Sequence, residues 1–270
     1  LRDNTTGTSN IGVGQATLLN NETGQNNVAV GHYALEDNTA SNNTAVGHNA
    51  LLQNTAGYQN TAVGATSLDA CTEGFKNTGV GFASLGSLTT GDENTAIGHN
   101  CLAANTTASY NVAVGRSALA ANTTGNQNVA VGSLALDANT TASSNTAVGY
   151  SSLSANTSGT RNAAFGDAAL VANTTGNDNS SFGGFSLSVN TTGSQNTACG
   201  GYALNKNTTA NSNVAVGYLA LFENTTGTQN VAVGSSALDA NTEGNHNVSI
   251  GYQSLTENTT GGQNVAVGTN

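Results

Sequence analysis

The sequence carries very little charge and contains no proline, methionine or tryptophan. Only 7% of its 270 residues are charged and 5% are aromatic, whereas an ordinary globular domain is about 25% charged. Five lysines and arginines stand against 15 acidic residues, for a net charge of −10. The sequence therefore lacks the basic face that nucleic-acid binding requires, and an anionic membrane surface is equally disfavoured as a partner.

Long apolar runs and paired cysteines are also missing. No apolar run approaches the roughly 20 residues that cross a bilayer, so we predict no membrane insertion. Three cysteines, Cys71, Cys101 and Cys199, make no disulfide framework, and we interpret them as small buried hydrophobic residues. The sequence begins without methionine or a signal peptide, which leads us to expect a segment of a longer fibre or filament.

The sequence does contain an internal repeat. Glycine recurs every 17 residues, as at Gly200, Gly217 and Gly234, with one 16-residue step from Gly31 to Gly47. Counted from the asparagine four residues before that glycine, each unit reads N-[TV]-A-V-G-x-x-[AS]-L-x-x-N-T-T-G-x-x, and we number its positions 1 to 17. Position 1 is asparagine in all 16 units and position 9 is leucine in all 15 complete ones. A repeat of this length indicates a solenoid.

The repeat unit predicts a strand followed by turns. Positions 2 to 4 alternate with the period of a strand and favour valine and threonine, whereas Asn-Thr-Thr-Gly is turn chemistry that would break a helix. We predict an all-β fold, a parallel β-solenoid of about 16 coils, with neighbouring strands about 4.8 Å apart. The repeat covers residues 1–270 as a single domain. The shortened unit loses its residue near Ala40 and Ser41, within a turn.

The asparagine at position 1 predicts an amide ladder. A side chain at the same place in every coil can bond to its equivalent in the next coil. The ladder would include Asn111, Asn128, Asn145 and Asn162. A binding row is the alternative. The recurring N-x-T sequons, such as Asn105, could accept glycans, but turn chemistry explains them.

Small residues at position 3 predict a contact between chains. We expect valine at position 4 and leucine at position 9 to fill the coil, so that position 3 faces outward. On this assignment Val131→Asp would prevent folding and Ser133→Asp would be silent. An outward row that never carries charge indicates a seam in a cyclic homo-oligomer, in the first place a homotrimer. The predicted seam comprises Ala113, Ala130, Ala147, Gly115 and Gly132. The alternative places position 3 inside and makes the valine row the seam.

The units at 111–119 (N-V-A-V-G-R-S-A-L) and 145–153 (N-T-A-V-G-Y-S-S-L) resemble the head repeats of trimeric autotransporter adhesins. That resemblance implies a left-handed parallel β-roll with three chains wound into one head. The longer unit, with N-T-T-G, is similar to repeats of phage tail fibres. The 17-residue period with its extra leucine departs from the adhesin pattern.

Groups that could perform chemistry are scarce and irregularly placed. His32, His48 and His99 occupy variable position 6. The first two fall in adjacent coils and could hold a metal in a trimer, but we interpret them as surface residues. No acidic pair is set by the repeat, and no phosphate-binding loop is present. We therefore predict no enzyme activity, no metal and no cofactor. The stretch from Cys71 to Leu88 is the least regular, and an enzyme on a β-helix would have its site there.

Exposed rings are the remaining candidates for contact with a ligand. Phe82, Tyr150, Tyr218 and Tyr252 occupy position 6 and could stack on sugars or grip a partner. We expect a structural or adhesive surface fibre, a rigid repeat segment outside the cell, on a cell or virion surface. Its partners would be copies of itself and a host-surface glycan or protein. One alternative is an ice-binding β-solenoid, suggested by threonine at positions 13 and 14. Another is a self-assembling extracellular filament subunit.

Overall fold

The fold is all-β in the computed structural model, which describes residues 2–269. One three-residue strand forms in each coil, at positions 2 to 4 of the repeat. The strands are β1 (Ile11–Val13), β2 (Val28–Val30), β3 (Thr44–Val46), β4 (Thr61–Val63), β5 (Thr78–Val80), β6 (Thr95–Ile97), β7 (Val112–Val114), β8 (Val129–Val131), β9 (Thr146–Val148), β10 (Ala163–Phe165), β11 (Ser180–Phe182), β12 (Thr197–Cys199), β13 (Val214–Val216), β14 (Val231–Val233), β15 (Val248–Ile250) and β16 (Val265–Val267). The predicted parallel β-solenoid is confirmed.

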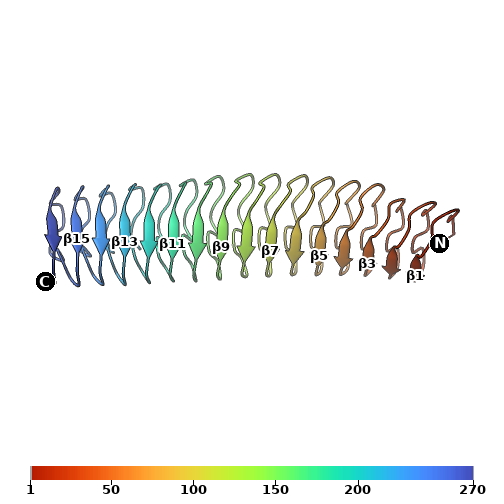
Figure 1. Ribbon diagram of the computed structural model, residues 1–270, viewed down its shortest axis with the longest axis horizontal. Coiled ribbons are helices and arrows are strands. Elements are labelled where there is room, and N and C mark those ends of the chain that lie inside the picture. The colour runs from red at the N-terminus through yellow and green to blue at the C-terminus, as the bar shows by residue number, and fades with distance from the viewer. Residues whose placement is uncertain (1, 270) are drawn as a thin grey trace. The chain divides into compact units, whose positions relative to one another are not determined.

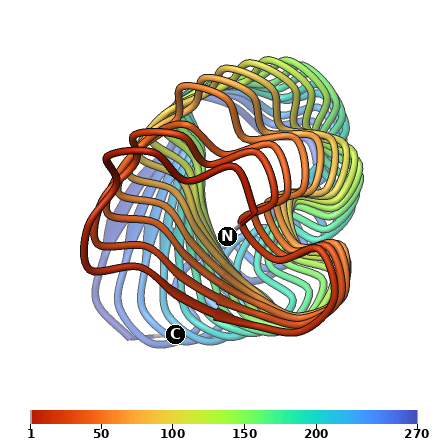
Figure 2. The same ribbon diagram turned by 90° about the vertical axis from the view of Figure 1, so that its right-hand side faces the viewer.

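The chain divides into two compact units, one up to Ser133 with β1–β8 and one from Leu134 with β9–β16. Within each unit consecutive strands lie side by side (Figure 1) and pair in parallel, with equivalent positions opposite each other, as Ala198 opposite Ala215. The coils of each unit follow the same path one behind the next (Figure 2). The repeat therefore sets the register, because a 17-residue step returns the chain to the same point of the coil.

Backbone hydrogen bonds join neighbouring coils well beyond the short strands. In the second unit, Gly200 N donates to Phe182 O at 2.7 Å, and Leu204 N donates to Ala220 O at 3.0 Å. In the turn, Thr191 N donates to Thr208 O at 2.8 Å. Each coil is thus bonded to its neighbours at many points of its circumference, which satisfies backbone groups that the turns would otherwise bury unpaired.

The direction of the strand side chains corrects the prediction for positions 3 and 4. Ala130, at position 3, is fully buried, whereas Val131, at position 4, is 36% exposed. The interior already holds leucine from position 9 and asparagine from positions 1 and 12, so only a small side chain fits at position 3. The expected failure of Val131→Asp to fold thus rested on a wrong assignment.

The predicted seam between chains is wrong for the same reason. Ala113, Ala130 and Ala147 are buried inside their own coils. Gly115 is needed for contact between coils, because a Cβ there would lie 2.5 Å from the carbonyl oxygen of Gly132. Its φ of +133° also disfavours any other residue. The alternative that we considered, with position 3 inside and the valine row outside, describes the alternation correctly.

The coil closes through corners that turn signals in the sequence did not reveal. Positions 7, 9 and 17 adopt left-handed φ, and the leucines at position 9 have φ between 49° and 54°. A left-handed conformation costs an L-residue about 1–2 kcal/mol. Leucine tolerates it here because the corner directs its side chain into the interior, where position-9 leucines such as Leu136 and Leu221 are fully buried.

Candidate functional site

The asparagines at position 1 form a buried ladder within each unit. In the first unit, Asn128 donates from its backbone N and its Nδ2 to Asn111 Oδ1, at 2.9 and 3.2 Å. In the second, Asn162 donates in the same way to Asn145 Oδ1, at 3.0 and 3.2 Å. Asn162 Nδ2 also donates to Gly176 O at 2.8 Å. These amides are turned inward and engaged, so they hold coils together and present nothing to a ligand.

A second buried ladder runs through position 12. Asn190 Nδ2 donates to Asn173 Oδ1 at 2.8 Å and to Gly193 O at 2.9 Å. The first bond joins two coils, and the second closes the Asn-Thr-Thr-Gly turn. The sequence indicates this second ladder only by the recurrence of asparagine at position 12, in 13 of 15 complete units. Sequon asparagines such as Asn105 lie in this column and are fully buried, which leaves no room for a glycan in the folded chain.

The outward surface of the strands is apolar, and we call it the sheet face: the side chains at positions 2 and 4 of β1–β8 and of β9–β16. Position 2 is mostly valine or threonine and position 4 mostly valine. Val216 is 37% exposed and Ile250 is 40% exposed. Neither position carries a charged residue. The sheet face is therefore an apolar surface that the folded chain leaves open to solvent in each unit.

The cysteines differ in exposure. Cys71 and Cys101 are buried as predicted, and burial raises the pKa of both thiols to about 12. Cys199 is exposed, which corrects the prediction that it is buried. It occupies position 4, so it lies on the sheet face. The structure thus contains two protonated, enclosed thiols and one accessible thiol.

The titratable side chains of residues 2–269 form no group of three or more that could hold a metal. His32 and His48 do lie in adjacent coils, with ring centroids 5.5 Å apart. Burial raises the pKa of the Asp69 and Asp239 carboxyls. Each of these carboxyls also accepts backbone hydrogen bonds, which act in the opposite direction on its pKa. None of these features recurs in every coil along the repeat.

The four predicted contact rings are all exposed, and one of them belongs to a larger cluster. Tyr218 meets Tyr202 edge to face at 6.2 Å, and Tyr202 stacks on Phe185 at 5.3 Å. We call Phe185, Tyr202 and Tyr218 the ring cluster. Phe82 stacks on His99 at 5.4 Å. Tyr150 and Tyr252 are also more than half exposed. The ring cluster was not apparent in the sequence because its members occupy positions 6 and 7 of three different coils.

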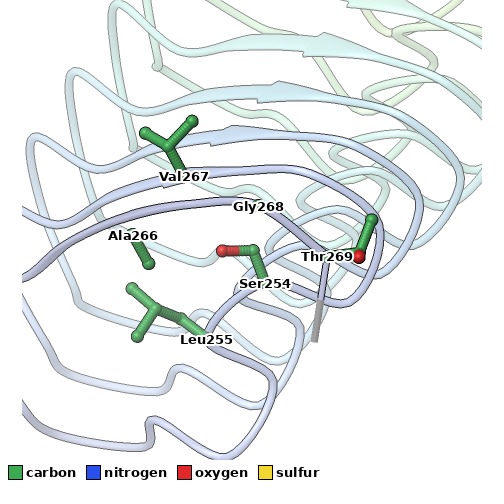
Figure 3. A pocket seen from close by; sticks show the side chains of 6 residues that line it. All are labelled: Ser254, Leu255, Ala266, Val267, Gly268 and Thr269. Atoms are coloured by element: carbon green, nitrogen blue, oxygen red, sulfur yellow. The ribbon is translucent and has the colours of Figure 1, made fainter.

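A hollow of about 200 Å³ opens beside the last described coil. Figure 3 shows Ala266 and Leu255 pointing into it, with the Ser254 hydroxyl nearby, whereas Val267 points away. The hollow is the interior of the coil seen from its end, lined by the same small and leucine positions as the coils before it. The hollow illustrates that position 3 points inward and position 4 outward. The residues that line it include no acid, base or nucleophile other than hydroxyl groups.

Comparison of the chain with models of known protein families found no match, and neither did comparison with curated proteins. Among residues 2–269, no helix is long and apolar enough to cross a membrane. The case for a function therefore rests on the surfaces described above.

Proposed function

We propose that this chain is a structural and adhesive segment of an extracellular fibre, on a cell or virion surface, that assembles with copies of itself through the sheet face. The observation that carries the proposal is the open apolar sheet face on a coil whose interior is already full. Burying valine or isoleucine side chains is worth about 25 cal/mol per Å². The repeat keeps such residues facing water in every coil and places no charge among them. This pattern favours a sheet face that a partner chain covers.

The size of the sheet face fits a stable contact between chains. Eight strands about 4.8 Å apart, each about 10 Å long, present roughly 400 Å² of flat area per unit. Exposed apolar patches of a few hundred Å² commonly mark interaction sites. The sheet face of each unit thus has the size of a patch that commonly binds a partner.

The spacing of the sheet face points to a second copy of the chain as the occupant. Apolar side chains recur at each coil, about 4.8 Å apart. A partner must present apolar groups at the same interval to pack against every one of them, and another copy of this repeat does so. The resemblance to trimeric adhesin heads supports three chains and a left-handed coil. The ring cluster would then be an outward contact for a glycan or protein. A self-assembling filament subunit would use the same contacts.

The solution mass tests the proposal. We expect light scattering on a gel-filtration column to give three times the chain mass, and a maleimide to react slowly with Cys199, because the partner chains cover it. A Val216→Asp variant should give the mass of one chain and fast Cys199 labelling, with Cys71 and Cys101 protected in both proteins. A wild-type chain that remains a monomer at high concentration would overturn the proposal.

One observation favours ice binding as a second candidate. The threonines at positions 13 and 14 both face outward, because Asn173 and Gly176 on either side take the inward positions. The position-13 hydroxyls are held in place, as Thr174 Oγ1 donates to Thr191 O at 3.0 Å. Position 13 thus forms a nearly continuous threonine column with a repeat of about 4.8 Å, whereas position 14 is threonine in 10 of the 15 complete units.

Thermal hysteresis of the purified protein tests this second candidate. An ice-binding surface should produce hysteresis that is lost when Thr192→Tyr interrupts the exposed position-14 column. Ser194→Tyr, two residues further along the same coil, is the control and should retain it. Absence of hysteresis at high protein concentration would remove ice binding from consideration.

A further inference from the structure

The sheet face is nearly uniform except in three neighbouring strands, of which β12 differs only in carrying Cys199 at position 4. From β1 to β9 and from β13 to β16, position 2 is valine, isoleucine or threonine and position 4 is valine or isoleucine. In β10 and β11, position 4 is enlarged to Phe165 and Phe182. Position 2 of the same strands is reduced to Ala163 and Ser180. The enlargement and the reduction occur together, and position 2 is alanine or serine in no other strand.

The two phenylalanines form one raised feature on the sheet face. Their rings are stacked, with centroids 5.0 Å apart and planes 8° apart. Both rings are exposed, although phenylalanine is a residue that folding normally buries. Beside them, Ala163 and Ser180 are smaller than the position-2 residues of the other strands. They lie next to each other because the strands pair in register, so the depression that they leave extends over two coils. A ridge and a depression thus lie next to each other in the same two coils, that is, at the same level along the stack of coils.

We propose that this ridge and depression are a register key: Phe165 and Phe182 of one copy seat on Ala163 and Ser180 of a second copy at the same level. The inference rests on the proposed self-assembly through the sheet face and adds its geometry. The copies lie parallel and level, and each sheet face contacts two neighbours in a closed ring.

The closed ring brings the complementary positions together. In a cyclic assembly the contact is heterologous, so the position-4 edge of one chain meets the position-2 edge of the next. A ring added at position 4 then needs space at position 2 of the same level, since interfaces pack as densely as interiors. An antiparallel pair would place position 4 of one copy against position 4 of the other, so the rings would not reach Ala163 and Ser180.

A register key has a clear physical use in this repeat. Identical valine columns would pack almost equally well after a slip of one coil, because every strand offers the same surface. The two phenylalanines make one level different from the others. A slip by one coil would place Phe165 or Phe182 against a filled position 2, and overpacking of this kind costs typically 1–3 kcal/mol.

A double-mutant cycle on the full chain tests the key through the concentration at which half of the assembly dissociates, measured by sedimentation. We expect Ala163→Val to raise that concentration roughly tenfold or more, because it fills the depression. Phe165→Val should also raise it, because it leaves a void. The combined variant, A163V/F165V, copies the Val-Ala-Val strand found in β13 and β14 and should recover most of the loss. Thr146→Val, which exchanges two residues of nearly equal size at position 2 of β9, should have little effect.

The outcomes separate the register key from the proposed function. Strong coupling between the two substitutions in association, with monomer stability unchanged, supports the key. Purely additive effects with the assembly retained would overturn it and leave self-assembly standing. Coupling that appears in the thermal unfolding of the monomer alone would also overturn it, because each ring would then pack on its own strand. A wild-type chain that never associates would overturn both proposals.

Discussion

Replacing Ala215 with aspartate should prevent the second unit from folding. Ala215 is the middle residue of β13, is fully buried, and lies between Ala198 and Ala232 of the neighbouring strands. An unpaired carboxylate in that interior costs several kcal/mol, a large part of the 5–15 kcal/mol that stabilises a typical domain. We expect loss of the β-sheet circular dichroism signal at neutral pH.

The next residue along the strand provides the matched control. Val216 belongs to the sheet face and its side chain is 37% exposed, so Val216→Asp should retain the β-sheet signal. Its effect should appear in association, where a charge on a covered apolar surface is unfavourable. If Val216→Asp unfolded the chain while Ala215→Asp did not, the inward and outward positions would be the reverse of those described.

Replacing Asn213 with alanine should produce the second large effect. Asn213 is a buried position-1 residue whose Oδ1 accepts from Asn230 N at 3.0 Å and from Asn230 Nδ2 at 3.2 Å. Its own Nδ2 donates to Gly227 O at 2.9 Å. Truncation leaves a buried backbone N–H without its acceptor, and each such group costs about 1–3 kcal/mol. We expect a loss of about 2–4 kcal/mol in urea unfolding.

Asn211 is the control for this prediction because it lies in the neighbouring turn and is exposed. Its Oδ1 accepts one hydrogen bond, from Ser194 N at 2.7 Å. Asn211→Ala should cost about 1 kcal/mol or less, since water can replace that bond. Equal losses for the two variants would show that the ladder contributes no more than an ordinary surface asparagine.

Much of the fold could be predicted because the repeat constrains it. A 17-residue step with one strand-like segment and one Asn-Thr-Thr-Gly turn allows few structures other than stacked parallel coils. The ladder through Asn111 and Asn128 followed from the same logic, because identical residues at identical places in a stack become neighbours. The strand direction could not be predicted in this way, since alternation separates two faces without stating which one is inside.

Two features depended on corners that the sequence does not mark. Leucine at position 9 gives no turn signal, yet Leu136 and its equivalents have left-handed φ. That corner turns leucine inward and helps to fill the space that valine at position 4 was expected to occupy. The second ladder at position 12 likewise depends on the turn, which directs Asn190 inward and leaves the threonine after it outside.

The sequence by itself determined the all-β class, the parallel coils, their register and the asparagine column at position 1, because each follows from the period alone. Only the tertiary structure decided which side of the strand faces the interior. The reason is one of volume: leucine and two columns of asparagine leave space for alanine but not for valine. That choice turned the valine row, with Phe165 and Phe182, into the apolar surface on which the proposed assembly rests.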